Sequence, residues 1–129
     1  MALPALLTLA GCAARTTAPA GLPKGVLEIR EGVATYYGRE FHGRTTASGA
    51  RFDMQSLVAA HPTYPFGTVV RVTNLTNGRS VRVRIVDRGP AAGARAAGVV
   101  IDLSYRAADS LRFLRDGRAR VRLEVLRWG

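Results

Sequence analysis

A carboxylate ends the clearest strand pattern in this chain. Apolar and polar residues alternate over residues 80–87, and Asp87 falls in phase with Val83 and Ile85. Alternation of this kind is typical of a half-buried β-strand, so it predicts Asp87 on the face that holds the aliphatic side chains. Because Gly89 and Pro90 follow at once, that face should lie at a rim. Asp87 is therefore a candidate general acid; the alternative is an Asp that accepts backbone N–H groups of the next turn.

The composition describes a small, basic, globular protein. The chain has 129 residues, of which 47% are hydrophobic, and these suffice for one domain with a modest core. It carries 19 basic and 9 acidic residues, a net charge of +10, and Lys24 is its one lysine. Such a charge favours an anionic partner, namely nucleic acid, acidic lipid headgroups or a polyanionic cell-wall polymer, although a basic face is often only a solvated one.

Cys12, the one cysteine, follows Leu9-Ala10-Gly11, and residues 2–11 are apolar and uncharged. This stretch resembles a bacterial lipoprotein signal, in which the cysteine becomes lipidated and N-terminal. It is too short to span a bilayer, which takes about 20 residues. No Lys or Arg precedes it, which departs from the usual signal, and the alternative is a chance cysteine. We expect a signal peptide over residues 1–11 and a protein anchored outside the cytoplasm through Cys12.

The rest of the chain predicts a tether and one mainly β domain. Residues 12–24 are rich in Ala, Thr, Pro and Gly and predict a flexible tether, and the domain should cover residues 25–128. The expected strands are residues 32–37, 57–60, 68–75, 80–87, 99–103 and 119–128. Asn77-Gly78 predicts a tight hairpin, and Ser104 can cap one short helix. Six short strands and one helix suggest a small closed barrel without free edges.

Four sequence blocks at their spacing resemble one family. They are Ala34-Thr35-Tyr36-Tyr37-Gly38; the run from Phe41 through Thr46-Ala47-Ser48-Gly49; Ala59-Ala60-His61-Pro62 with Pro65-Phe66-Gly67-Thr68; and Val72-Thr73-Asn74-Leu75 through Asp87-Arg88-Gly89-Pro90 to Ile101-Asp102-Leu103-Ser104. Together they resemble the rare lipoprotein A family of Gram-negative bacteria over most of residues 32–126. The resemblance implies a six-stranded double-psi β-barrel related to expansins.

The resemblance also implies an activity. Members are lipoproteins on the periplasmic side of the outer membrane that cleave peptidoglycan glycan strands without water and leave 1,6-anhydro ends. It implies no cofactor and a monomer whose partners are glycan strands and, through the lipid anchor, the membrane. A metal site is not expected, because His42 and His61 are the only histidines and no thiolate accompanies them.

The family's catalytic groups map onto this chain with one departure. Its aspartate falls on Asp87 and its histidine on His61, whereas the position of its glutamate holds Ala50. Asp87 alone can serve in turn as acid and base if the sugar's 6-hydroxyl is the nucleophile, and His61 can orient as well as catalyse. The residues expected to contact substrate are Tyr37, Phe41, His42, Thr46, Ser48 and Arg88.

Ala50 leaves a second function open. An expansin-like module that binds peptidoglycan without cleaving it would tolerate Ala50. Asp53 is a candidate to replace the missing carboxylate, although its context favours a turn-fixing role, and Asp102 is interpreted as structural. Nucleic-acid binding would follow from charge alone, and the lipoprotein leader argues against it.

Overall fold

The computed structural model describes residues 21–129. The predicted signal peptide, Cys12 and most of the predicted tether lie outside the described residues. The strands are β1 (Glu28–Tyr37), β2 (Val58–Ala60), β3 (Val69–Asn74), β4 (Ser80–Asp87), β5 (Val99–Ser104) and β6 (Arg118–Arg127). The helical segments are a 3-10 turn, η1 (Arg39–Phe41), and two short helices, α1 (Ala92–Ala96) and α2 (Tyr105–Ser110).

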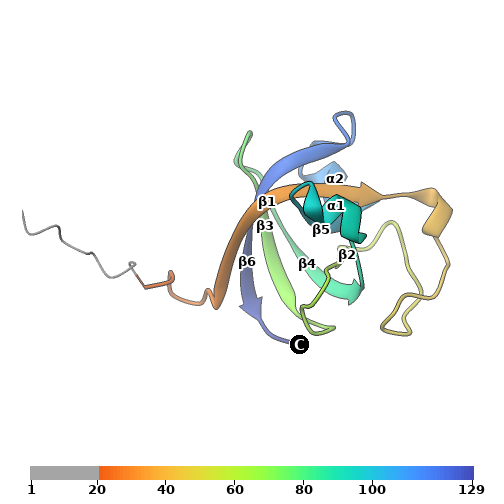
Figure 1. Ribbon diagram of the computed structural model, residues 1–129, viewed down its shortest axis with the longest axis horizontal. Coiled ribbons are helices and arrows are strands. Elements are labelled where there is room, and N and C mark those ends of the chain that lie inside the picture. The colour runs from red at the N-terminus through yellow and green to blue at the C-terminus, as the bar shows by residue number, and fades with distance from the viewer. Residues whose placement is uncertain (1–20) are drawn as a thin grey trace, which may run out of the picture.

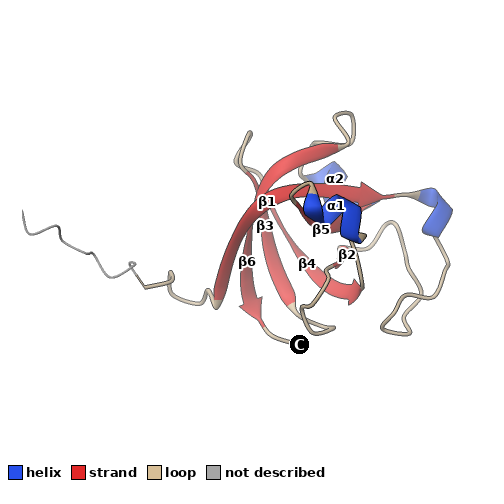
Figure 2. Cartoon of the chain, in the orientation of Figure 1, coloured by secondary structure: helices blue, strands red, loops and turns tan. Residues whose placement is uncertain are grey.

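The six strands close into a barrel in the order β1-β5-β2-β4-β3-β6. Figures 1 and 2 show the strands wrapped around a single core, with α1 outside the barrel and packed against β5. Two neighbouring pairs, β1 with β5 and β2 with β4, run parallel. The other four pairs are antiparallel. This topology confirms the predicted double-psi β-barrel.

Strand bounds follow the sequence pattern most closely where burial alternates. In β4 the side chains of Val83 and Ile85 are buried, and those of Arg82 and Arg84 are exposed. The prediction was less accurate for β1, which begins at Glu28 rather than at residue 32. The connection from β3 to β4 is longer than the predicted tight hairpin, since it covers residues 75–79, with Gly78 at φ 75°.

The predicted helix is present, and one more was missed. Ser104 caps α2, because its side-chain oxygen accepts a hydrogen bond from the backbone N–H of Ala107. The second helix, α1, has five residues, none of them buried, and no capping side chain. It therefore lacks both the apolar periodicity and the start signal by which a helix is predicted.

The barrel interior is aliphatic. Sixteen buried residues form the main core, including Val70, Val72, Val83, Ile85, Ile101, Leu103, Val121, Leu123 and Val125. A smaller buried cluster, formed by Tyr37, Phe52, Met54 and Ala60, lies apart from it. Ala59 belongs to the main core and Ala60 to the smaller cluster. Because neighbours on a strand point to opposite faces, the smaller cluster marks the outer wall of the barrel at this point.

None of the helices formed by residues 21–129 is long and apolar enough to cross a membrane.

Candidate active site

Strand pairing aligns four residues on the outer wall of the barrel, one from each of four adjacent strands. Thr35 of β1 pairs with Asp102 of β5. Ala60 of β2 pairs on one side with Asp102 and on the other with Asp87 of β4. Paired residues point to the same face, and adjacent strands lie about 4.8 Å apart, so the Cα atoms of the two aspartates should be roughly 10 Å apart. The barrel therefore brings two carboxylates to one side of its wall.

A β-bulge, rather than simple alternation, turns Asp87 outward. Ala59 pairs with Ile85, but the next residue of β2, Ala60, pairs with Asp87, so β4 contains one extra residue, Val86. The prediction that Asp87 continues the inward series of Val83 and Ile85 was therefore wrong. Bulges re-aim side chains and are frequent next to active sites. The bulge explains why this carboxylate reaches solvent instead of the core.

One oxygen of Asp87 is fixed and the other is free. Oδ1 accepts hydrogen bonds from the backbone N–H groups of Ala47 and Arg88, each at 2.9 Å. Oδ2 has no hydrogen-bond partner among residues 21–129. It nevertheless reaches solvent, because in that part of the chain the Tyr37 hydroxyl is the one buried side-chain nitrogen or oxygen atom that lacks a partner. Asp87 thus accepts backbone N–H groups of the following turn, as the alternative interpretation of the sequence held. Its second oxygen remains exposed to solvent.

Asp87 lines a small cleft with a volume of about 170 Å³. Its lining comes from the outer wall, η1 and the turn after β4: Tyr37, Phe41, Ala60, Asp87, Arg88, Gly89, Pro90, Ala91 and Asp102. Arg88 makes no ion pair with Asp87; its guanidinium donates to the carbonyl oxygens of His61 and Tyr64 and covers the ring of Phe66 at 3.9 Å. The carboxylate is therefore neither sealed in the interior nor neutralised by its neighbour.

Asp102 is the site residue that the sequence interpretation missed. It shares the cleft with Asp87, and Thr35 donates a hydrogen bond to its Oδ1 at 3.2 Å. The pKa of Asp102 is raised to about 6: burial is the main cause, the Thr35 hydrogen bond opposes it, and the charges of Asp87 and Glu40 add to it. The available signal was a lone carboxylate inside the apolar run of residues 99–103.

Tyr37 lies between the cleft and the smaller buried cluster. Its ring stacks on Phe52 with centroids 4.3 Å apart, and only 7% of the residue is exposed. Its buried hydroxyl has no hydrogen-bond partner among the described residues. The pKa of Tyr37 is raised well above its usual value, first by burial and then by the charges of Asp87 and Asp102. The hydroxyl therefore stays protonated at neutral pH.

The other predicted substrate contacts divide into two groups. Phe41, which is 40% exposed, and Arg88 line the cleft beside the two aspartates. His42, Thr46 and Ser48 do not line it. The ring of His42 accepts a hydrogen bond from the backbone of Met54, which gives this side chain a place in the structure of the loop.

Thr46 and Ser48 support the loop that holds Asp87. The Thr46 hydroxyl donates to the carbonyl of Ala50 at 2.8 Å and lies 2.9 Å from the Ser48 hydroxyl. The same loop gives Asp87 the N–H of Ala47, and the Ser48 N–H bonds the carbonyl of Val86. These two side chains therefore position the catalytic candidate instead of facing the cleft.

The structure separates His61 from the cleft. Its backbone N–H bonds the carbonyl of Asp87, but its ring stacks on Tyr64 with centroids 3.5 Å apart and lines a neighbouring cavity. Its Nδ1 accepts hydrogen bonds from the backbone N–H groups of Thr63 and Tyr64 at 3.1 and 3.0 Å. The pKa of His61 falls to about 4, mainly because of burial, so the ring is neutral at pH 7.

Ala50 and Asp53 supply no second carboxylate to the cleft. Ala50 is exposed, and its backbone bonds Thr46 and Ser48 within the loop. Asp53 accepts hydrogen bonds from the backbone of Gln55 and the hydroxyl of Ser56, which lower its pKa. These contacts favour the turn-fixing role for Asp53. Over residues 21–129 no group of three or more His, Cys, Asp or Glu side chains is placed to hold a metal ion.

Sequence comparison identifies relatives over the whole barrel. A family model described as lytic transglycolase matches residues 29–123. A protein of Treponema pallidum, named probable endolytic peptidoglycan transglycosylase RlpA, is 54% identical over 97 residues, which are 75% of this chain and 29% of that protein. Endolytic peptidoglycan transglycosylase RlpA of Vibrio cholerae is 46% identical over 104 residues, 81% of this chain and 37% of that protein. The chain thus spans about a third of the length of these relatives.

Solved structures share the fold. The Streptomyces papain inhibitor superposes with a TM-score of 0.61 at 27% identity, covering 79% of this chain and 97% of that one. The apo expansin of Clavibacter michiganensis gives a TM-score of 0.60 at 22% identity, covering 78% of this chain and 51% of that one. The barrel is thus common to proteins of different function. With the family match over residues 29–123 and the identities to the RlpA proteins, the chain belongs to the lytic transglycolase family and, within it, to the rare lipoprotein A proteins.

Proposed function

We propose that this protein is a lytic transglycosylase that cleaves peptidoglycan glycan strands and leaves 1,6-anhydro ends, with Asp87 as the general acid and base. One observation carries the proposal. Asp87 is held by two backbone hydrogen bonds at Oδ1, while its Oδ2 is free beside an open cleft. A general acid needs a fixed carboxyl group with one oxygen within reach of the substrate.

The reaction needs no positioned water. Protonated Asp87 gives its proton to the glycosidic oxygen as the bond from C1 to that oxygen breaks. The 6-hydroxyl of the same sugar then attacks C1, and its proton passes to the Asp87 carboxylate. The products are a free hydroxyl on the leaving sugar and a 1,6-anhydro ring, and Asp87 returns to its starting protonation state.

A second carboxylate completes the chemistry in this proposal. Glycosidic cleavage passes through a transition state with positive charge on the sugar ring. Asp102 lines the same cleft, and its pKa of about 6 leaves it mostly ionised at pH 7. Its negative charge would stabilise the developing positive charge. Asp102 would therefore supply part of the contribution that the glutamate makes elsewhere in the family, because that position holds Ala50 here.

Ala50 also favours one alternative, a non-catalytic module that binds peptidoglycan. Such a protein would retain the cleft and the basic surface and would not need a complete set of catalytic carboxylates. The two functions predict different products from the same incubation. Purified protein and its Asp87→Asn variant are mixed with peptidoglycan sacculi, and the soluble fraction is analysed by mass spectrometry for 1,6-anhydro glycans.

The transglycosylase proposal expects anhydro products from the wild-type protein and at least a 10²-fold slower release from Asp87→Asn. The binding module would sediment with sacculi in both forms and release nothing. Hydrolytic products without the anhydro ring would contradict both proposals.

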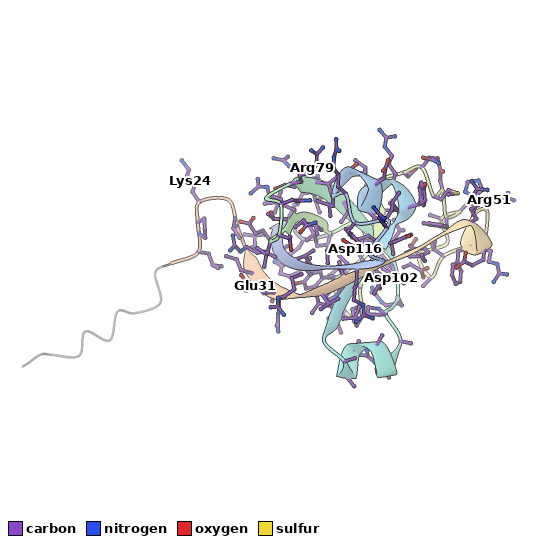
Figure 3. All side chains as sticks on the ribbon, turned by 90° about the horizontal axis from the view of Figure 1, so that it is seen from above. Lys24, Glu31, Arg51, Arg79, Asp102 and Asp116 are labelled. Atoms are coloured by element: carbon purple, nitrogen blue, oxygen red, sulfur yellow. The ribbon has the colours of Figure 1, made fainter. Side chains whose placement is uncertain are left out.

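We also propose that the protein works on the periplasmic side of the outer membrane, anchored by a lipid on Cys12. Arg51, in the loop that holds Asp87, lies at the end of the molecule opposite Lys24 (Figure 3). This supports an arrangement in which the loop that holds Asp87 extends away from the anchored end. Labelling with radioactive palmitate, compared between wild type and Cys12→Ser, tests the anchor; equal labelling would contradict it.

A further inference from the structure

A cavity with a volume of about 580 Å³ lies between the turn that joins β3 to β4 and the loop that follows α2. The turn contributes Arg79. The end of α2 and the loop contribute Asp109, Ser110, Arg112, Leu114 and Arg115. None of these residues lines the cleft of Asp87. The cavity is therefore separate from the candidate active site.

Hydrogen bonds hold the two walls of this cavity together. The carbonyl of Leu111 accepts hydrogen bonds from the side-chain amides of Asn74 and Asn77, each at 3.0 Å. The Nε of Arg79 donates to the carbonyl of Ser110, also at 3.0 Å. Asn74 and Leu111 are buried, so these bonds join the loop to the body of the barrel. A ligand that binds here need not first order the loop, which favours its affinity.

Arg112 has an unfavourable backbone conformation. It is the one non-glycine residue among residues 21–129 with a positive φ, 57°. The Cβ of an arginine is crowded in this left-handed region, which Gly and Asn adopt more readily. Hydrogen bonds on both sides hold the conformation, since the N–H of Arg112 bonds the carbonyl of Asp109 and that of Phe113 bonds the carbonyl of Ala108. Conformations held in this way are frequent at ligand-binding sites, and here the strained residue places a guanidinium group at the cavity.

The arginines of the cavity are not neutralised by acidic side chains. Three arginines and one aspartate line it, which gives a net charge of +2. In the part of the chain that the structure describes, none of these four side chains forms an ion pair. Three positive charges around one cavity repel one another, and an anion between them would relieve that repulsion.

We propose that this cavity binds a phosphate monoester through the guanidinium groups of Arg79, Arg112 and Arg115. Near neutral pH such a group carries a charge of roughly −1.5 to −2 and three oxygens that accept hydrogen bonds. It therefore matches both the net charge of the cavity and the number of its arginines, whereas a carboxylate offers one charge and two oxygens. The same group occurs in soluble phosphate esters and in the headgroup of phosphatidic acid.

Glycerol 1-phosphate is the probe, and succinate is its control. Each is titrated at constant ionic strength, because salt screens surface charges, into the ¹⁵N-labelled chain, and amide shifts of residues 77–80 and 109–117 are followed. We expect saturable binding of glycerol 1-phosphate with a dissociation constant below about 1 mM. Succinate carries its two charges on separate carboxylates and should bind about tenfold more weakly, the effect of losing one charge-assisted hydrogen bond. Equal affinities, or shifts that do not saturate, would overturn the proposal.

Arg112→Asn separates binding from folding. Because Asn adopts the left-handed conformation more readily, the midpoint of urea unfolding should not fall, while the affinity for glycerol 1-phosphate should fall about tenfold. Arg115→Gln, at an exposed position of the same loop, should weaken binding to a similar degree and gives a second reading if Arg112→Asn alters stability. Wild-type affinity in both variants would overturn the proposal.

Arg127→Gln is the matched control. It removes the same charge from the far end of β6, which begins at Arg118 just after the loop and is roughly 30 Å long. Its affinity for glycerol 1-phosphate should equal that of wild type. A loss as large as that in Arg112→Asn would show that only net charge matters and would overturn the site.

Vesicles distinguish the two sources of the phosphate. Proteins that carry Cys12→Ser, so that no acyl chain takes part, are sedimented with phosphatidylcholine vesicles with and without phosphatidic acid. Sedimentation that requires phosphatidic acid, and that Arg112→Asn weakens more than Arg127→Gln, would assign the site to the lipid headgroup. Saturable binding of glycerol 1-phosphate without such sedimentation would assign it to a soluble ester. None of these measurements depends on cleavage, so the site and the transglycosylase proposal can fail separately.

Discussion

Asp87 and Asp102 flank Ala60 on the outer wall of the barrel and line one cleft. They come from β4 and β5, which are separated only by the short strand β2. The charge of Asp87 contributes to the raised pKa of Asp102, so the two carboxyl groups interact electrostatically. This pair, rather than Asp87 with His61, forms the ionisable centre of the cleft.

The pair predicts that Asp102 is needed for cleavage. Asp102→Asn keeps an oxygen that can accept the Thr35 hydrogen bond, but it removes the negative charge that would stabilise the sugar cation. We expect anhydro-product release to fall by about 10²-fold. The wild-type rate should also decline as the pH falls through about 6, where Asp102 becomes protonated, and this decline should be absent in the variant.

Asp109→Asn is the matched control for that substitution. Asp109 is an exposed carboxylate on α2 and does not line the cleft. Its replacement should leave both the rate and the pH profile unchanged. An Asp102→Asn variant with the wild-type rate and profile would return Asp102 to the structural role that the sequence suggested.

Asp102→Asn should also make the protein more stable at neutral pH. The pKa of Asp102 is raised from 3.8 to about 6, so the folded state binds more protons than the unfolded state between these values, and stability is lost as pH rises through them. The cost at pH 7 is on the order of 3 kcal/mol. His61 acts in the opposite direction, because its lowered pKa makes stability fall as pH drops from 6.5 to about 4.

The two pH effects overlap, so the difference between variant and wild type is the informative quantity. Urea unfolding is measured for both proteins at pH 4 and pH 7. The free energy of unfolding of Asp102→Asn, relative to that of wild type, should be larger at pH 7 than at pH 4. The contribution of His61 is the same in both proteins and cancels in this difference. A constant difference between the two proteins would show that Asp102 titrates normally.

The alternation of apolar residues was sufficient to predict the strands whose burial is periodic. It located β4 at its observed bounds and most of β6, since local periodicity reports which side chains face a core. It could not predict the orientation of Asp87, because the bulge at Val86 appears only when β4 pairs with β2. A bulge depends on the partner strand, which no local pattern encodes.

The role of Asp102 was hidden for a related reason. Residues 99–103 indicate a buried strand, in which one carboxylate looks like a structural exception. Only the pairing of β5 with β2 brings it next to Asp87, which is 15 residues earlier in the chain. His61 also depends on tertiary structure, because the backbone of residues 63 and 64 decides which ring nitrogen carries the proton.

Restoring the family glutamate tests whether its role transfers to this barrel. Ala50 is exposed, so Ala50→Glu should fold normally. We expect it to raise the rate of anhydro-product release by about tenfold, which is less than the roughly 10²- to 10⁴-fold of a full acid–base group, because Asp102 supplies part of that contribution. Ala50→Gln has the same size without the charge and should not raise it. If both variants match wild type, Asp102 already supplies what the glutamate supplies elsewhere.

The loop that holds Asp87 should be needed for both stability and activity. Thr46 is 6% exposed, and its hydroxyl donates to the carbonyl of Ala50, which closes the loop around Ala47. Thr46→Val keeps the shape of the side chain but removes the hydrogen bond from the hydroxyl to the carbonyl of Ala50. Because that carbonyl keeps the backbone N–H of Thr46 as a donor, the free energy of unfolding should fall by about 0.5–1.5 kcal/mol, the net contribution of one hydrogen bond. Cleavage should fall further than stability requires, since a less firmly closed loop would hold the N–H of Ala47 less firmly against Asp87 Oδ1. Ser48→Ala, at an exposed position of the same loop, should have the smaller effect on both; the reverse order would place the support of Asp87 at Ser48.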